Sequence, residues 1–549
     1  HGSVCGGCLV AFSVLRKAFP KVYCNNALES KVDAPAAGLN AGWRRVIAAT
    51  GKALSWPRQS AAITTEQAAE TAGLDSALLL EFSELGFRLS AWLSLPLMLV
   101  LAPLHAAAGG GAAKSDRLGW IDMGNVRFDH SWLYYVHALV VWGVCLLVRA
   151  FLLRAQAKFL KLRFAWLLDL PAPRATTILL AHIPQACRSV SYVRAFLSGI
   201  FSDDAVQEVH FVKRTGALAS MVQAQDRARE LLREAELRAE RDDVRPTHRV
   251  LPSGAQVDSM SHYKEELDAL EAPIAAERAR IAEGAAAASG DVNSHCAFVT
   301  FATRRQAEMA RDLRFSANRN QWQVSFPPEP SAISWQALVL EPRRSALMAL
   351  LGTGVIVALY LFFTPLCALI TSAASTIRAG PLQPVWAALA PTIGLRLMLM
   401  FLPTILLTIF RLLFPLKSEP ESQHQLQVWF FAFEFVFVIL VTAISTSLVD
   451  TLQQLAHAPL SVFDLLGKKM PGATHFYMNY LVLTWSTFGI GLLRLSNLAK
   501  FLAWRALYTE EEARQKAEPE DQDSDGMGAR YAEYAVSLCI CLIFSTLSP

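Results

Sequence analysis

The chain has 549 residues, of which 53% are hydrophobic and 18% are charged, and its formal net charge is +4. The charged share lies below the roughly 25% of an ordinary globular domain, and so small a net charge gives no bulk affinity for nucleic acid. A chain of this length and composition is therefore not one soluble domain, and the grouping of its apolar residues decides its class.

The apolar residues are grouped in long runs, as in helices that cross a membrane. A spanning helix needs about 20 mostly apolar residues. Residues 1–15 have the composition of the end of such a helix, residues 16–76 that of a cytosolic linker, and residues 534–549 that of the start of a last helix. Six candidate spans without Asp, Glu, Lys or Arg lie between them, at 89–113, 131–148, 345–377, 397–410, 435–449 and 472–493.

Two of these candidate spans continue past a single charged residue. The fourth extends back through Arg396 to about residue 385, and the fifth extends back through Glu434 to about residue 428. We therefore predict eight spans, the first and the last of them incomplete, in a chain that is a piece of a longer protein cut at both ends.

Basic residues predict the orientation of the spans, because cytoplasmic flanks carry an excess of Lys and Arg. The segment RAFLLRAQAKFLKLRF at 149–164 is strongly basic, and EPRRS at 341–345 agrees with it. The chain is then divided into two transmembrane helices within 77–154, a cytosolic domain at 155–340, and a bundle of five spans at 341–549.

Strands and helices alternate in the predicted cytosolic domain. Residues 217–286, rich in Ala, Glu and Arg, form an insertion of two charged helices. The other predicted elements are a strand at 176–184, a helix at 189–201, a strand at 206–214, a strand at 294–302, a helix at 304–314 and a strand at 321–330. This is the ferredoxin-like order of RNA-recognition modules. The predicted fold is thus a multi-span α-helical membrane protein with a cytosolic α+β domain.

The third strand, SHCAFVTFA, lacks the chemistry with which such modules bind RNA. The places of the expected basic residue, glycine and stacking aromatic hold Ser294, His295 and Cys296, and the first strand has Leu179 where an aromatic would stack a base. We therefore interpret the domain as a structural scaffold with no nucleic-acid partner.

Two ionisable residues lie inside predicted spans, where a charge costs about 2.5 to 3.5 kcal/mol on the insertion scale. They are Arg396, within PTIGLRLMLMFLP, and Glu434, within WFFAFEFVFVILV. Either the two side chains line a water-filled conduit, or they pair with each other or lie near the headgroups, because both arrangements satisfy the same desolvation penalty.

Helix-weakening residues also lie in the spans. Gly489 and Gly491 form a candidate hinge, although close helix packing is the commoner use of glycine in membranes. Pro365 and Pro403 are candidate kinks, which free backbone carbonyls that need another partner.

The sequence carries no pattern of an enzyme or of a cofactor site. It has no Walker loop, no GxSxG and no HExxH, and of its nine cysteines only Cys5 and Cys8 form a CxxC pair. We predict no enzymatic activity, no metal and no cofactor.

Several segments, in this order, resemble one known family. They are FSVLRKAF, GLDSALLLEFSELGFRL, TILLAHIP, AFVTFATRRQAEMA, WQVSFPPEPSAISWQAL and YAEYAVSLCICLIFSTLSP. The chain resembles, nearly from end to end, the hyperosmolality-gated calcium-permeable channels of plants (the OSCA family) and their animal TMEM relatives. These are mechanically gated cation channels related in fold to the anoctamins.

The resemblance implies a pore within one subunit, formed by the five spans of residues 341–549. Arg396 falls where plant members often have Lys, and Glu434 falls near pore-facing polar positions. Gly491 falls where many members carry a pore Glu, a departure that implies a less selective pore. Glu533, at the start of the last span, completes the candidate pore-lining or gating residues. The implied partners are membrane lipids and permeant calcium, potassium and sodium ions.

The resemblance also implies gating by membrane tension in the plasma membrane, with a hinge at Gly489 and Gly491. Plant members dimerise through the cytosolic domain and animal members are monomers, so both a homodimer and a monomer remain open. Two other functions compete with the channel: an anoctamin-like lipid scramblase, and a membrane-anchored RNA-binding protein, which the missing stacking residues disfavour.

Overall fold

The computed structural model of this chain describes residues 2–23, 56–109, 118–126, 130, 132–250, 255–287, 291–376, 399–441, 463, 466–467, 470–517 and 526–549. Among these residues, five helical segments are long and apolar enough to cross a membrane. They are α8 Leu74–Ala107, α9 Trp132–Leu168, the first part of α15 Pro342–Thr376, the segment Met470–Trp504 with α21 Thr474–Leu492 and α22 Leu495–Trp504, and α24 Met527–Phe544. The chain is therefore an integral membrane protein.

The helices extend beyond the apolar stretches that predict them. Helix α9 has 37 residues, although the predicted span ends at residue 148. At a rise of 1.5 Å per residue it is roughly 55 Å long, while a bilayer core is about 30 Å thick. The basic second half of α9 therefore continues the helix outside the hydrocarbon. Composition predicts only the part of a helix that lipid surrounds.

Three shorter helices complete the described bundle. Helix α1 Gly2–Ala18 packs along α21, and the apolar helix Leu399–Leu413 overlaps the predicted fourth span and extends three residues beyond its end. Helix α17 Glu419–Glu434 continues directly as the π-helix η7 Phe435–Val441. The rest of the predicted fourth and fifth spans, with Arg396, lies outside the described residues.

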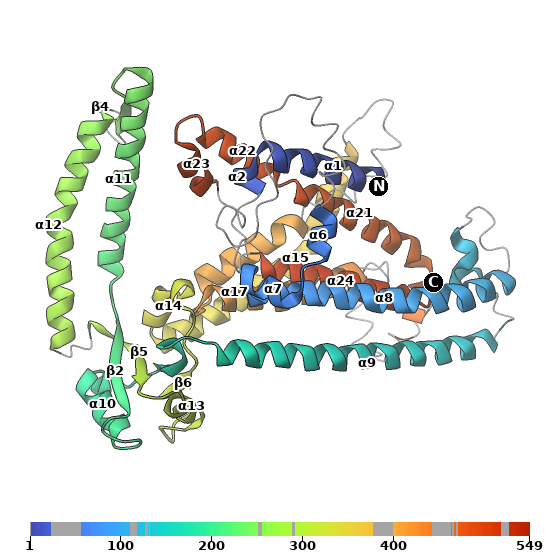
Figure 1. The fold of residues 1–549 in the computed structure, drawn as a ribbon, viewed down its shortest axis with the longest axis horizontal. Coiled ribbons are helices and arrows are strands. Elements are labelled where there is room, and N and C mark those ends of the chain that lie inside the picture. The colour runs from blue at the N-terminus through green and yellow to red at the C-terminus, as the bar shows by residue number, and fades with distance from the viewer. Residues whose placement is uncertain are drawn as a thin grey trace.

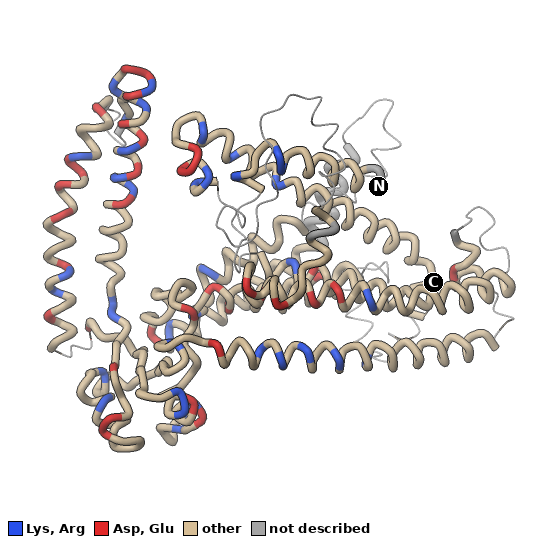
Figure 2. The backbone as a smooth tube through the Cα atoms, in the orientation of Figure 1, with Lys and Arg blue, Asp and Glu red and all other residues tan. Residues whose placement is uncertain are grey.

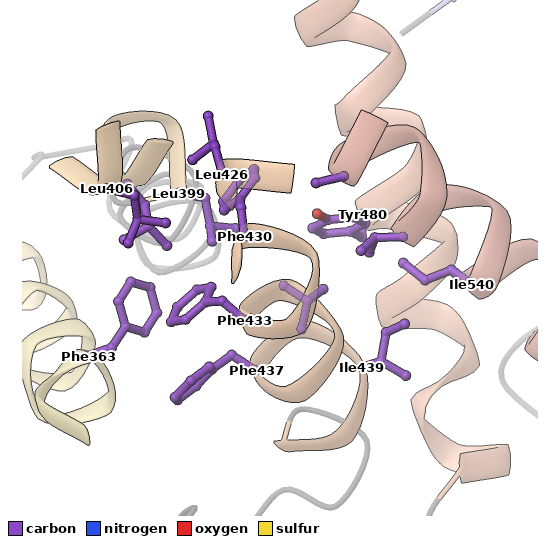
Figure 3. Close-up of a cluster of buried hydrophobic side chains, with 14 of the residues drawn as sticks. Phe363, Leu399, Leu406, Leu426, Phe430, Phe433, Phe437, Ile439, Tyr480 and Ile540 are labelled. Carbon is purple, nitrogen blue, oxygen red and sulfur yellow. The ribbon is translucent and has the colours of Figure 1, made fainter. Parts of the chain in front are cut away.

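Helices α8, α9 and α24 pack together along one side of the bundle, and α8 and α9 run side by side in Figure 1. Leu93 and Leu97 of α8, Val144 of α9 and Leu538 of α24 belong to one apolar cluster between these three helices. A larger cluster joins α15, α17, η7, α21 and α24 (Figure 3).

A four-stranded sheet lies at one end of the long helices (Figure 1). Its strands are β1 Thr177–Ala181, β2 Val206–Lys213, β5 Asn293–Phe301 and β6 Gln323–Ser325, in the antiparallel order β2-β5-β1-β6. Helices α10 Val190–Ser198 and α13 Arg304–Asp312 cover one face, where Leu180, Val299 and Phe301 form the core. The predicted order of strands and helices is the order in the structure.

The insertion between β2 and β5 is a long helical hairpin, α11 Gly216–Asp242 and α12 Ser259–Ala286. The two charged helices are present as predicted, and they pack along each other. Two short strands, β3 Thr247–Val250 and β4 Ala255–Asp258, close its tip and were not predicted. Figure 2 shows charged residues along this hairpin and on one half of α9, and the charged residues of α8 likewise lie in its first half, Asp75 to Arg88.

Candidate functional site

The junction between α17 and η7 places a carboxylate inside the bundle. Glu434 is the last residue of α17 and is 1% exposed. The helix widens to a π-helix at the next residue, Phe435, a change that often marks functional positions. A widened turn disrupts the regular series of backbone hydrogen bonds of the α-helix. The buried carbonyl oxygens of that turn then need other hydrogen-bond donors.

A tyrosine of α21 supplies such a donor. The hydroxyl of Tyr477 lies 2.8 Å from the carbonyl oxygen of Val438 and 2.7 Å from that of Ile439, and donates its hydrogen bond to this pair. On the other side of α17, the hydroxyl of Tyr360 from α15 donates to the carbonyl oxygen of Trp429 at 2.7 Å. Side chains of both flanking helices therefore hold the α17–η7 backbone.

Aromatic rings fill the space between α15 and α17–η7. The rings of Phe433 and Phe437 stack with their centroids 4.4 Å apart, and Phe363 meets Phe433 edge-on at 4.5 Å (Figure 3). These rings close the space between the two helices, and Glu434 beside them is itself shielded from solvent, being 1% exposed.

Helix α21 carries a polar stripe, defined here as Thr474, Tyr477, Tyr480 and Thr484, and Tyr477 joins the stripe to this junction. All four residues are buried. The Thr484 hydroxyl donates to the carbonyl oxygen of Tyr480 at 2.8 Å, within its own helix. A search for charged residues misses this stripe, but the three- and four-residue spacing of hydroxyl side chains in THFYMNYLVLT is a signal that could have found it.

Helix α24 crosses α17 at very close range. The backbone N–H of Gly528 donates to the side-chain oxygen of Gln423 at 3.1 Å. A Cβ atom at Gly528 would lie 2.2 Å from the carbonyl oxygen of Gln423, so only glycine fits this crossing. Glu533, a predicted site residue, is partly buried on the same helix.

The two glycines of the predicted hinge lie in an unbroken part of α21. A Cβ atom at Gly489 would meet Cys5 and Cys8 of α1 at ordinary contact distance, whereas a Cβ atom at Gly491 would have no neighbouring atom within 4 Å. The helix breaks instead at Arg494, whose φ of 44° separates α21 from α22.

The two prolines lie within helices. Pro403 is partly buried in the helix Leu399–Leu413. Pro365 lies in α15, and its side-chain surroundings are outside the described residues.

The segment after α22 is held by a group of contacts that we call the linker clamp. Its helix α23 Glu510–Lys516 meets the insertion helix α11 through the ion pairs Lys516–Glu230 and Arg233–Glu512. The Tyr508 hydroxyl donates to the Glu234 carboxylate at 2.9 Å. Leu237 of α11 packs on the apolar cluster of Phe501 and Tyr508.

The N-terminal helix α2 Pro20–Tyr23 joins the same clamp. The ammonium of Lys21 lies 2.9 Å from carboxylate oxygens of both Glu510 and Glu511, and these carboxylates, Glu511 first, raise the pKa of Lys21. The hydroxyl of Tyr23 donates to the carbonyl oxygen of Leu493 at 2.6 Å, beside the helix break. The clamp therefore connects the end of α21 with two distant parts of the chain.

The second face of the sheet is covered by the segment that leads into α15. Leu338 of α14 Trp335–Val339 packs against Leu179, Val212 and Cys296 of the sheet. The ring of Phe298 meets the ring of Trp335 at 6.2 Å. RNA-recognition modules stack bases on this face, so α14 occupies the place that a base would need.

Ion pairs fix the same segment at the start of α15. The Glu341 carboxylate lies 3.2 Å from the guanidinium of Arg188 and also pairs with Arg214. Burial alone raises the pKa of Glu341, but the two guanidiniums outweigh it and hold this pKa below its ordinary range. Nε2 of His295 donates to the carbonyl oxygen of Leu340 at 3.0 Å, and burial lowers the pKa of His295 to about 4.

Three family models match the chain in sequence. Residues 1–155 match "Late exocytosis, associated with Golgi transport". Residues 175–337 match "Cytosolic domain of 10TM putative phosphate transporter". Residues 349–549 match "Calcium-dependent channel, 7TM region, putative phosphate". Together these matches cover most of the chain in the order of the predicted domains.

Three similar curated proteins come from plants. The chain is 23% identical over 499 residues to the CSC1-like protein ERD4 of Brassica juncea, covering 82% of this chain and 66% of the relative. It is 26% identical over 265 residues to the hyperosmolality-gated Ca²⁺ permeable channel 1.8 of Arabidopsis thaliana, covering 45% of this chain and 32% of the relative. It is 21% identical over 578 aligned positions to channel 1.5 of the same plant, covering 98% and 74%. The chain spans less than two thirds of the length of the first two.

Proposed function

We propose, because this chain belongs to the family of hyperosmolality-gated calcium-permeable channels, that it forms a cation channel with its pore inside one subunit. The observation that carries the proposal is the buried Glu434 at the α17–η7 junction, facing a bundle whose α21 presents the polar stripe. A carboxylate inside a membrane bundle is costly, and such residues face the interior of the bundle and commonly mark ion pathways.

The described arrangement is the closed state of this pore. Glu434 is 1% exposed, and the hydroxyl of Tyr477 ties η7 to α21. Opening requires α21 to move away from η7, so that the polar stripe and Glu434 meet water. Gly491, rather than a second carboxylate, stands further along α21, which favours modest selectivity among calcium, potassium and sodium ions.

Membrane tension is the proposed stimulus. Stretch thins the bilayer and changes the mismatch at helix ends, and a state with a larger area in the membrane plane then gains population. The linker clamp would convey this movement, because it joins the end of α21 to α11 and α2. The sheet domain, which we propose to be ferredoxin-like and cytosolic, is tied to α15 by Glu341. We place the channel in the plasma membrane, as a homodimer through this domain or as a monomer.

Patch recording from proteoliposomes under pressure steps tests the channel. Wild-type protein is expected to carry a pressure-dependent cation current, and Glu434→Gln to reduce its calcium permeability relative to potassium. Glu240→Gln, which changes an exposed carboxylate on α11, is the matched control and should leave this ratio unchanged. No current at any pressure in the wild type would refute the proposal.

Lipid scrambling is the second candidate function. A cavity of about 700 Å³ lies between α9 and α24, lined mainly by apolar side chains with Arg149, Gln156 and Thr546 among them. Such a lining accepts acyl chains and a polar headgroup together. A dye-quenching assay in liposomes separates the two functions, since flipping of labelled lipid without current favours the scramblase.

A further inference from the structure

Two histidines form a closed pair at the end of the bundle opposite the sheet. His105 of α8 and His137 of α9 are 0% and 7% exposed. Their Nε2 atoms lie 2.7 Å apart, and their rings are parallel within 10° with centroids 4.8 Å apart. Neither side chain takes part in the pore or the linker clamp described above.

The contacts of the pair fix its protonation. Nδ1 of His105 lies 2.7 Å from the carbonyl oxygen of Ile121, and because a carbonyl only accepts, this Nδ1 carries a proton. In a neutral ring, Nε2 of His105 is then an acceptor. Nε2 of His137 must therefore carry the proton that joins the two rings. A further proton on His105 would set two N–H groups against each other at hydrogen-bond distance.

The pair lies beneath a loop that connects both helices with the pore helices. Asn125 of this loop donates from its amide to the carbonyl oxygens of His105 at 3.4 Å and Trp120 at 3.1 Å. The backbone N–H of Met123 donates to the carbonyl oxygen of Leu547, just after α24, at 2.8 Å. Loosening the pair would therefore loosen the loop and its hold on the end of α24.

The titratable groups around the pair come from the loop and from α21. Asp122 of the loop is buried and faces both His105 and His475 of α21. Burial raises the pKa of Asp122, although bonds from the Gly124 N–H and the Thr474 hydroxyl lower it. The described residues of α8, α9 and α24 nearest the pair, 101–107, 132–140 and 544–548, bring no other charged side chain.

We propose that the His105–His137 pair is a pH-sensitive brace that acid opens. A proton on Nδ1 of His137 would leave the bond between the rings intact, but it would place an imidazolium charge where both side chains are buried. Acid therefore favours the loosened state, in which the charged ring reaches water. If only that state binds the proton, its population relative to the braced state rises as the pH falls through the ordinary histidine pKa of about 6.5, and by about tenfold for each further unit below it. As far as it concerns gating, the inference rests on the proposed channel function: acid on this side should lower the pressure that opens the pore.

Hydrogen exchange of residues 118–126 in the full chain, measured at pH 7.5 and pH 5.5 and corrected for intrinsic rates, tests the brace without any current. We expect exchange to accelerate by at least about tenfold at pH 5.5 in the wild type. His137→Gln, whose amide can still donate to His105 but does not titrate, should show a smaller acceleration, while His130→Gln should behave as the wild type. Asp122→Asn tests whether the loop carboxyl is responsible instead.

Equal exchange at both pH values in the wild type, or an acceleration that His137→Gln leaves intact, would overturn the brace. Recording at the same two pH values then addresses gating. An unchanged pressure threshold with pH-dependent exchange refutes the regulatory role alone, whereas absence of current at either pH refutes the proposed channel and leaves the brace standing.

Discussion

Tyr477 of α21 donates a hydrogen bond to the carbonyl oxygen of Val438 in η7, at a distance of 2.8 Å. This bond joins the helix that bears the polar stripe to the distorted turn just after Glu434, and it is fully buried. It therefore links two helices of the proposed pore directly.

Tyr477→Phe should weaken this link. The substitution leaves buried carbonyl oxygens without their donor, which costs about 1 to 3 kcal/mol. We expect a lower thermal unfolding midpoint in detergent and a lower opening pressure. Tyr135→Phe removes a hydroxyl from an exposed tyrosine of α9 and should change neither. If Tyr477→Phe opened at the same pressure as the wild type, Tyr477 would have no part in gating.

Gly528→Ala should distort the crossing of α24 and α17. The new methyl group would lie 2.2 Å from the carbonyl oxygen of Gln423. Because this oxygen belongs to the backbone, it cannot move away unless one of the two helices shifts. Overpacking of this kind costs about 1 to 3 kcal/mol. Gly143→Ala in α9 has open space and should be neutral or slightly stabilising, since alanine favours helix. Equal unfolding midpoints for the two variants would show that α24 and α17 do not pack as closely at Gly528 as described.

The linker clamp predicts a charge-reversal rescue. Lys516→Glu places two acidic groups together and should shift the opening pressure, and adding Glu230→Lys should restore it. Exposed ion pairs contribute only about 0.2 to 1 kcal/mol, so the unfolding midpoint should move little while the pressure threshold moves measurably. A double variant that behaves as the sum of the two single ones would show that the pair is not coupled.

The ion pairs of Glu341 predict a dependence of stability on pH. The pKa of Glu341 is lower in the folded chain than its ordinary value of about 4.3. The contribution of Glu341 to the free energy of unfolding is therefore fully present above that value. It is lost as the pH falls through the pKa that Glu341 has in the folded chain. Glu341→Gln should thus be less stable than the wild type at pH 7, and the difference should shrink towards pH 3. A difference independent of pH would point to lost packing instead.

The positions of the long apolar helices that the structure describes, and the order of strands and helices, could be predicted from the sequence, because both follow from local apolar patterns. The same patterns place Glu434 in a membrane helix, but they do not predict the π-helix that begins beside it. Nor do they predict the linker clamp or the covering of the sheet by α14. These features depend on contacts between side chains that are far apart along the chain, such as Lys516 and Glu230. A local sequence pattern does not predict such contacts.

The hinge of α21 is predicted at Gly489 and Gly491, and the structure offers a second position for it. The helix is continuous through both glycines and breaks at Arg494, whose left-handed backbone (φ 44°) a residue with a side chain adopts at a cost. If the bend works at Arg494, Ala at both glycines should leave the opening pressure unchanged, because Gly491 has free space and Gly489 has its nearest neighbours at ordinary contact distance.

Arg494→Val and Arg494→Gly then test the second position. Valine strains the left-handed conformation and should straighten the join between α21 and α22, whereas glycine adopts it freely. Both variants remove the guanidinium, so a difference between them reports the backbone and not the lost charge. We expect the opening pressure to change more in Arg494→Val than in Arg494→Gly. The hinge would lie at Gly489 and Gly491 if Ala at both glycines shifted the opening pressure strongly and the two Arg494 variants opened at equal pressures.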